Sequence, residues 1–218
     1  CTFFGSVCSI TLALLLNELW GTRFKRIVQS VSYLPNFIST VVIVGMLTTI
    51  FSYTGTINQL LSSLHVDAVR FIGTSKWYRF LYVLSDVWKG VGWGSIIYLA
   101  AIAGVNPELY ESAMIDGASR FKRMLHITLP SIRATIVILL ILDCGKLLDV
   151  STEKTLLMYS PVVYDVADVI ESYVYRRGIE DLDFSYAGAV SMFTALISII
   201  IVLTVNKISV KVTEVGLF

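Results

Sequence analysis

Long apolar runs make up most of the chain, and shorter polar stretches separate them. A helix that crosses a lipid bilayer needs about 20 predominantly apolar residues. Five stretches approach or meet this length, at about Thr2–Leu19, Val31–Tyr53, Phe80–Val105, Ser131–Leu148 and Tyr186–Val205. The pattern therefore predicts an all-α, polytopic membrane helical bundle with about five transmembrane helices, in a single domain that covers residues 1-218.

Composition strengthens the membrane interpretation. Of the 218 residues, 56% are hydrophobic and 15% are charged, whereas soluble domains are usually about 45–50% apolar and about 25% charged. The net charge of +1 and the lack of a dense Lys/Arg stripe argue against a nucleic-acid partner. The cysteines and histidines lack the spacing of metal ligands, so we expect no metal site and no cofactor. These residues are Cys1, Cys8, Cys144, His65 and His126.

Loop charges indicate the orientation, because cytoplasmic loops of membrane proteins carry an excess of Lys and Arg. Three polar stretches that would share one side are basic, and they carry Arg23, Lys25, Arg26, Arg120, Lys122, Arg123, Lys207 and Lys211. The stretch 149–185, which would lie on the other side, is rich in acids. The loop 53–79 on that side also holds Arg70, Lys76 and Arg79, so the asymmetry is imperfect. We expect residues 106-130 and the C-terminus to be cytoplasmic.

The polar segment between the third and fourth apolar runs reads E-S-A-M-I-D-G-A-S-R-F-K-R-M-L-H-I-T-L-P, from Glu111 to Pro130. The preceding Asn106-Pro107 should end the third span, because proline lacks a backbone donor and restricts its predecessor. Residues from about Glu108 to Ser119 favour a short helix, with acids near its start, where the helix dipole stabilises them. A plain cytoplasmic turn is the alternative to a functional element.

This segment resembles the EAA loop of binding-protein-dependent ABC importers, in which a membrane subunit docks onto its ATPase. Most of the family's positions are in register, although Ser112 replaces the first alanine of E-A-A. The resemblance implies that the helix sits in a cleft of the ATPase, where Glu111 pairs with a basic residue. The implied docking residues are Glu111, Ser112, Ala113, Asp116, Gly117, Ala118, Ile127, Leu129 and Pro130.

Other segments are similar to permeases for complex sugars, among them the lipoprotein-associated polysaccharide permeases. They are Asn17–Arg26, Ser32–Ser39, Trp88–Ile102 and Asp168–Gly178. Complete members of that branch have six spans, so we expect an N-terminally truncated sequence. The resemblance implies half of a translocation path for an oligosaccharide or polysaccharide-derived sugar, in the bacterial plasma membrane. The implied partners are ABC ATPase subunits, a second homologous permease subunit, an extracytoplasmic solute-binding lipoprotein, the lipid bilayer and the sugar.

The chain has no G-x-x-x-x-G-K-[ST] phosphate loop, so we expect a non-catalytic subunit whose energy comes from an ATPase partner. An ABC permease for amino acids, peptides or metals is the nearest alternative. An ion-coupled secondary transporter also tolerates charged residues within spans. A membrane scaffold or intramembrane enzyme is a further alternative, but H-E-x-x-H and G-x-S-x-G motifs are absent.

Charged and aromatic residues within the spans are the candidates for the substrate path, because ionisable groups there tend to face a cavity or a partner. Asp86 with Lys89, and Asp143 with Lys146, are spaced i,i+3, so each pair is expected either to neutralise itself or to line the path. Aromatic side chains in the same helix either offer flat faces to sugar rings or anchor the interface. The candidates are Asp86, Trp88, Lys89, Trp93, Tyr98, Asp143 and Lys146.

One segment of the acidic outer loop has a helical pattern of its own. Within Tyr164–Arg177, apolar side chains would gather on one helical face, which predicts an external amphipathic helix. Such a helix lies on the membrane or packs against the bundle.

Overall fold

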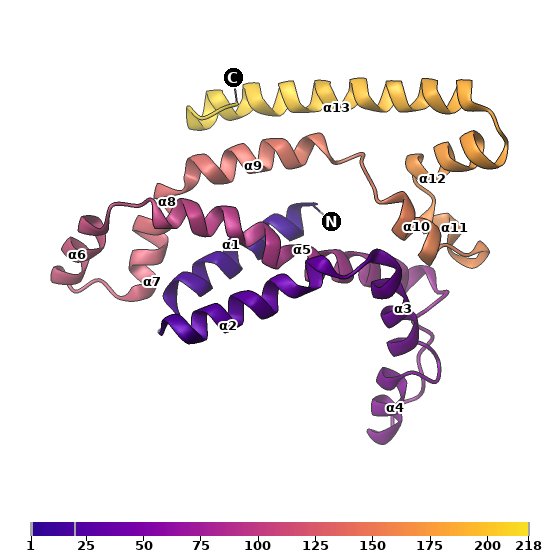
Figure 1. The fold of residues 1–218 in the computed structure, drawn as a ribbon, viewed down its shortest axis with the longest axis horizontal. Helices are drawn as coiled ribbons and strands as arrows, with labels where there is room; N and C mark the ends of the chain where they lie inside the picture. Colours follow the sequence, from indigo (N-terminus) through magenta and orange to yellow (C-terminus); the bar gives the residue numbers. More distant parts are fainter. Residues whose placement is uncertain (1, 20, 218) are drawn as a thin grey trace. The chain divides into compact units, whose positions relative to one another are not determined.

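The computed structural model describes residues 2–19 and 21–217, and every regular element among them is a helix (Figure 1). Cys1, one of the cysteines considered above, lies outside the described residues. The chain divides into two compact units: Cys1–Phe37, Val87–Gly145 and Ile199–Phe218 form unit 1, whereas Ile38–Asp86 and Lys146–Ser198 form unit 2. The predicted all-α class is confirmed, while the assignment of one permease domain stays a prediction.

Unit 1 contains the docking segment and the helices that hold it. Its elements are α1 (Thr2–Glu18), α2 (Thr22–Tyr33), η1 (Leu34–Phe37), the second part of α5 (Ser75–Ala103), α6 (Pro107–Ile115), α7 (Arg120–Arg123), η2 (Met124–Thr128), α8 (Leu129–Ser131), α9 (Arg133–Gly145) and the end of α13 (Phe184–Thr213). Their apolar core is formed by Ala13, Leu14, Tyr98, Ile102 and Ile132. This core joins α1, α5 and the start of α9 into one packed body.

Unit 2 consists of shorter helices around the first part of α5. They are α3 (Thr40–Ile50), α4 (Thr56–Ser63), α10 (Thr152–Met158), η3 (Pro161–Val163), α11 (Tyr164–Ala167), α12 (Ile170–Tyr175), η4 (Arg176–Glu180) and the start of α13. α10 packs on α3 and on α12. The core of the unit is formed by Tyr78, Tyr82, Val163 and Ala167.

The second predicted span, Val31–Tyr53, is not one continuous helix. The structure divides this run into the helical segment Thr22–Phe37, which belongs to unit 1, and Thr40–Ile50, which belongs to unit 2. Pro35 lies in the intervening 3-10 turn, and the Ser39 side chain then caps α3 by accepting a hydrogen bond from the Val42 N–H at 3.4 Å. Proline removes a backbone donor, and the serine cap begins a new helix, so the apolar run is broken.

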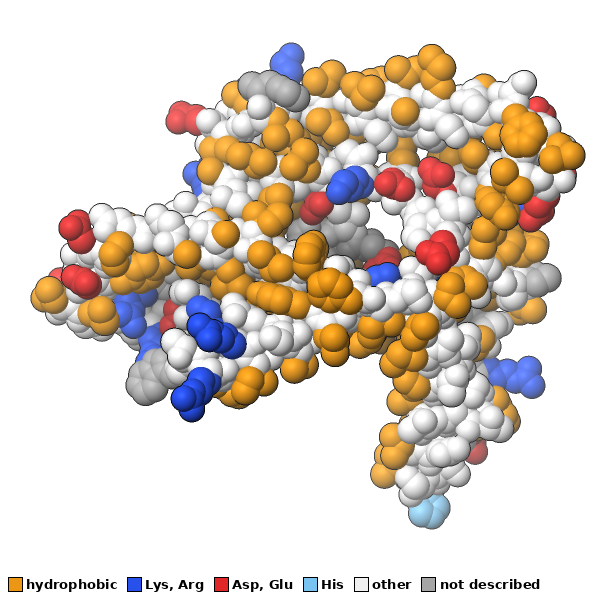
Figure 2. Space-filling model, in the orientation of Figure 1, with side chains coloured by type: hydrophobic (Ala, Val, Ile, Leu, Met, Phe, Trp, Pro, Cys, Tyr) orange, Lys and Arg blue, Asp and Glu red, His pale blue; other side chains and the backbone are white. Residues whose placement is uncertain are grey.

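The other apolar runs form helices of unequal length. By length and composition, Phe184–Thr213 can cross a membrane alone, and up to four spans result if each bent helix pair counts as one. α1 has 17 residues and falls just short. The fourth predicted span corresponds to α9, which follows Arg120–Ser131 at an angle of 61°. Figure 2 shows apolar side chains along α13, a surface that suits lipid or another membrane subunit.

The predicted external helix Tyr164–Arg177 is interrupted and is therefore wrong as one helix. α11 ends before Asp168, whose carboxylate accepts a hydrogen bond from Ser172 Oγ at 2.6 Å and two from Arg176 at 2.8 and 3.0 Å. These bonds tie Asp168 to two side chains at or beyond α12, at the position where the helical path is interrupted between Ala167 and Ile170. The Arg176 guanidinium holds the pKa of the Asp168 carboxyl below its ordinary value.

A close approach of α2 and α5 depends on Gly92. A Cβ atom placed there would lie 1.9 Å from the Ser32 carbonyl oxygen, whereas one placed on Gly90 would meet nothing within 4 Å. This agrees with the expectation that small residues permit tight packing of membrane helices.

We predict that Gly92→Ala destabilises the protein by about 1–3 kcal/mol, because backbone must move to admit the methyl group. Gly90→Ala is the matched control and should be neutral or stabilising by up to about 1 kcal/mol, since alanine favours the helix interior. Thermal unfolding in detergent measures both changes. Equal melting temperatures for the two variants would contradict the packing argument.

Candidate functional site

The docking segment begins with a well-capped helix. The Asn106 side chain accepts a hydrogen bond from the Glu108 N–H at 3.0 Å, and Pro107 occupies the first turn of α6. Proline is favoured there because its missing N–H would have no intrahelical partner in any case. The predicted break at Asn106-Pro107 is therefore present, and the α5 and α6 axes differ by 73°.

The end of α6 explains the glycine of the motif. The Ala118 N–H donates to the Ala113 carbonyl at 2.9 Å, and the Gly117 N–H donates to the Met114 carbonyl at 3.1 Å. These two bonds form a Schellman turn, which needs a left-handed residue after the helix. Gly117 supplies it with φ +73°, and the space beside its Cα is open. Gly117 therefore sets the backbone direction and also leaves the surface bare.

After this turn the chain reverses into α7. The Ser119 side chain accepts from the Lys122 N–H at 3.4 Å, and a π-helical turn, η2, links α7 to α8. The Tyr110 hydroxyl lies 2.9 Å from the hydroxyl of Thr128, which is only 1% exposed. This hydrogen bond fastens α6 to the residues that lead into α9, so α6 and α7 form a braced hairpin at one end of unit 1 (Figure 1).

The predicted docking residues divide into two groups. Glu111, Ser112, Asp116, Gly117 and Pro130 are exposed, and Ala113 and Ala118 are partly exposed. Ile127 and Leu129 are half-buried, and Leu129 packs against the core of unit 1. The structure thus gives Leu129 an anchoring position, while the exposed group remains open to a partner.

Sequence reasoning missed the apolar part of this surface. Met114, Ile115 and Phe121 are 53%, 88% and 65% exposed. The sequence does indicate this surface, because Glu111, Met114 and Ile115 have the i, i+3, i+4 spacing of one helical face. Contiguous exposed apolar side chains mark interaction surfaces. Figure 2 shows basic side chains gathered in the region of α7 and the start of α2.

The expected pairing of Asp86 with Lys89 is wrong. The Asp86 carboxylate instead pairs with Lys154 Nζ at 2.5 Å, within unit 2. Lys154 also donates to the Tyr82 carbonyl at 2.8 Å and lies 4.0 Å from the centre of the Tyr82 ring. The Lys154 side chain is only 4% exposed and that of Asp86 is 34% exposed, so removing Asp86 would leave a buried ammonium group without this carboxylate. The spacing rule failed because a distant helix supplies a closer cation.

The expected pairing of Asp143 with Lys146 is also absent from the ion pairs of the described residues. Asp143 instead accepts a hydrogen bond from Ser6 Oγ of α1 at 2.7 Å, and Lys146 is exposed. Asp143 is partly exposed within the apolar helix α9. An intramembrane carboxylate held by a neutral donor fits the default expectation of a functional position.

The aromatic candidates have different environments. Tyr98 is 3% exposed and belongs to the core of unit 1, so protein side chains cover its ring. Trp88 and Trp93 are 47% and 51% exposed, and Trp93 makes an edge-to-face contact with Phe37 at 5.9 Å. Lys89 lies one helical turn from Trp93 on α5 and is partly exposed. A role in the substrate path stays a prediction for these residues.

The family model for the inner membrane component of binding-protein-dependent transport systems matches residues 5–212. The chain belongs to this family. It is 41% identical over 216 residues to Protein LplB of Bacillus subtilis, covering 99% of this chain and 68% of that protein. It is 40% identical to the B. subtilis polygalacturonan/rhamnogalacturonan transport system permease protein YteP, covering 96% of this chain and 65% of that protein.

Solved structures give the same result. The chain superimposes with a TM-score of 0.94 and 40% identity on a chain of a bacterial alginate ABC transporter in complex with an alginate pentasaccharide-bound periplasmic protein. The match covers 99% of this chain and 75% of that one. These comparisons confirm the resemblance to sugar ABC permeases and the membrane helical fold. The chain spans about two thirds of the relatives' length.

Proposed function

We propose that this chain is the permease subunit of an ABC importer, and that the α6–α7 hairpin is the element by which separate ATPase subunits move it. The observation that carries the proposal is the hairpin itself, whose exposed face combines Glu111 with Met114 and Ile115. An exposed apolar patch beside a carboxylate is typical of a surface that binds a protein partner. The Schellman turn and the Tyr110–Thr128 hydrogen bond hold that face in one conformation.

Force applied to α6 has a short physical route into unit 1. Tyr110 connects α6 to Thr128, which lies at the end of η2 and is buried. Leu129 and Ile132, directly after it, pack in the core with Ile102 of α5. Close-packed interiors transmit displacement because they have low compressibility. Movement of the hairpin would therefore shift α9 and the second part of α5 together, a rigid-body displacement of the kind that underlies alternating access.

The remaining partners follow from this arrangement. We place the hairpin and the C-terminus in the cytoplasm, because the basic residues of α2, α7 and the end of α13 would share that side. A second homologous permease would complete the translocation path, and the exposed apolar face of α13 is available to it or to lipid. A solute-binding protein would deliver the sugar from outside. The similar alginate transporter supports this partner, because it forms a complex with a pentasaccharide-bound periplasmic protein.

For the substrate, we propose an oligosaccharide cut from an acidic polysaccharide. The names of relatives at 40% identity support this class, because alginate is described as an acidic polysaccharide and polygalacturonan is a polyuronate. Lys89 and Trp93 of α5 carry suitable chemistry, since they share a helical face at i,i+4 spacing. An ammonium group binds a carboxylate, and an indole ring packs on a sugar face.

We predict that Glu111→Lys lowers recovery of the ATPase with the permease at least tenfold. The new lysine would face the basic residue that the family resemblance implies in the ATPase cleft, and like charges across an interface cost several kcal/mol. Glu180→Lys is the charge-matched control, exposed on the predicted outer side. Co-purification from membranes measures association, and ATP-driven uptake measures transport. Normal ATPase recovery with Glu111→Lys would contradict the docking role, whatever sugar is carried.

We also predict that Lys89→Met weakens transport of a uronate trisaccharide about tenfold or more, since hydrogen bonds between charged groups contribute about 1.5–3 kcal/mol. Transport of a neutral trisaccharide should change far less. Lys207→Met, exposed at the end of α13, is the matched control. Uptake into proteoliposomes that contain the whole transporter measures both substrates. Equal losses for charged and neutral sugars would contradict recognition of the carboxylate by Lys89.

A further inference from the structure

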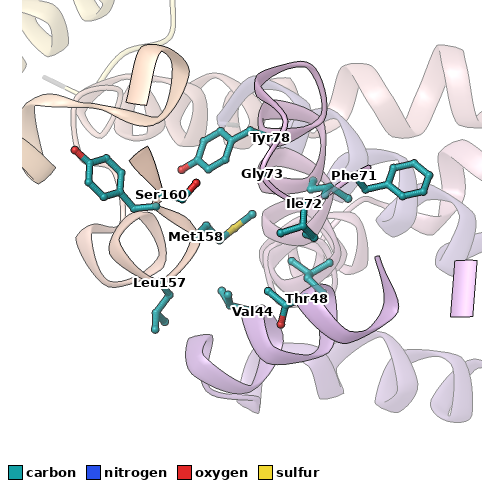
Figure 3. A pocket seen from close by; sticks show the side chains of 12 residues that line it. Val44, Thr48, Phe71, Ile72, Gly73, Tyr78, Leu157, Met158 and Ser160 are labelled. Carbon is teal, nitrogen blue, oxygen red and sulfur yellow. The ribbon is translucent and has the colours of Figure 1, made fainter. Parts of the chain in front are cut away.

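Unit 2 contains a pocket whose lining includes none of the residues assigned above to docking or to the substrate path (Figure 3). It lies between α3, the start of α5 and the residues that end α10, and its volume is about 280 Å³. Most of its wall is apolar, and it includes Val44, Leu47, Phe71, Leu81, Leu157 and Met158. This volume is near the lower end of the ~300–1,000 Å³ range of ligand sites.

One polar atom in the wall lacks a partner. Within residues 2–19 and 21–217, the Tyr78 hydroxyl is a buried side-chain oxygen without a hydrogen bond, and Tyr78 is 8% exposed. Figure 3 shows its ring reaching from α5 toward Ser160 and Met158. Buried hydroxyls are normally hydrogen-bonded, and an exception needs an explanation. A ligand with an acceptor oxygen would satisfy this donor.

The chemistry of the wall limits what that ligand is. A sugar would bring many hydroxyl groups, and a wall whose polar side chains are those of Thr48, Tyr78, Tyr159 and Ser160 would leave most of them without partners. A single water satisfies Tyr78 but fills only about 30 Å³. An aliphatic chain attached to one carbonyl matches both the apolar wall and the single orphan donor.

The position of the pocket supports a lipid. The predicted third span begins at Phe80, so Tyr78 lies at the expected boundary of the outer leaflet. Trp77 makes edge contacts with Phe71 and Phe80 at 4.9 and 5.8 Å, an aromatic cluster of the kind that marks membrane interfaces.

Three exposed cations, Arg70, Lys76 and Arg79, lie within nine residues of Tyr78 along the chain. They are the residues that made the loop asymmetry imperfect. An anionic lipid phosphate gives them a role on the outer side, because Lys and Arg bind phosphate by charge-assisted hydrogen bonds.

We propose that this pocket binds an acyl chain of an anionic phospholipid, with the Tyr78 hydroxyl donating to the ester carbonyl and the exposed cations near the phosphate. The site is independent of the sugar and of the ATPase. It would hold α3, α5 and α10 of unit 2 together from the lipid side.

The test uses the assembled transporter in nanodiscs and a phosphatidylglycerol whose acyl chain carries a photoactivatable diazirine. We expect saturable labelling of the peptides that contain Val44 or Leu157. Tyr78→Phe keeps the ring and should weaken labelling about two- to tenfold, the worth of one neutral hydrogen bond. Leu157→Trp should abolish labelling by filling the pocket.

Tyr175→Phe is the matched control, because Tyr175 is 37% exposed and does not line the pocket. It should label as the unchanged protein does. Thermal unfolding of each variant identifies any that fails to fold. If Tyr78→Phe fails to fold, the labelling of Leu157→Trp decides the result, and if Leu157→Trp fails, that of Tyr78→Phe decides it. The proposal would be overturned if both Tyr78→Phe and Leu157→Trp left the labelling unchanged. It would also be overturned if the labelling did not saturate and equalled that of the lipid-exposed helix α13. Density for an isolated water at Tyr78 in a lipid-filled nanodisc would also overturn it.

Discussion

The hydrogen bond between Tyr110 and Thr128 is the contact on which the account of this molecule depends. It joins a polar hairpin to a buried position at the entrance of α9, where Leu129 and Ile132 enter the core of unit 1. The Schellman turn at Gly117 fixes the other end of α6. With both ends held, a helix of nine residues behaves as part of the packed body. A free loop of the same sequence would absorb an applied force by bending.

Charges inside the apolar helices are handled differently in the two units. In unit 2, Asp86 pairs with the buried ammonium group of Lys154, which also contacts the ring and the backbone carbonyl of Tyr82. In unit 1, Asp143 receives one neutral hydrogen bond from Ser6. Because desolvation of a charge is costly, the first arrangement is suited to structure, and the second suits a position that meets a polar ligand.

Local chemistry was readable from the sequence. The break at Asn106-Pro107, the turn at Gly117 and the apolar runs all follow from backbone preferences that act over a few residues. The family resemblance then identified the docking segment, and the comparisons confirmed the family. The helical spacing of Glu111, Met114 and Ile115 also indicates their shared face, although the family motif does not include Met114 or Ile115.

Long-range pairing was not readable. Nothing near Asp86 in the sequence indicates Lys154, since the two residues are brought together by the contact of α10 with the first part of α5 within unit 2. The burial of Tyr98 likewise depends on α1 and α9, which lie far away along the chain. The interruption of Val31–Tyr53 was available in Pro35, but hydropathy alone averages over it. Tertiary contacts decide such positions, and local propensity does not.

The most direct measurement of the central claim is disulfide cross-linking from Ile115→Cys, the most exposed apolar position of the hairpin at 88%. In inside-out membrane vesicles that contain the whole transporter, the account predicts a cross-link to a cysteine in the ATPase cleft, with a yield that changes on addition of ATP. Labelling of Ile115→Cys by an impermeant thiol reagent in intact cells, without any cross-link to the ATPase, would contradict it.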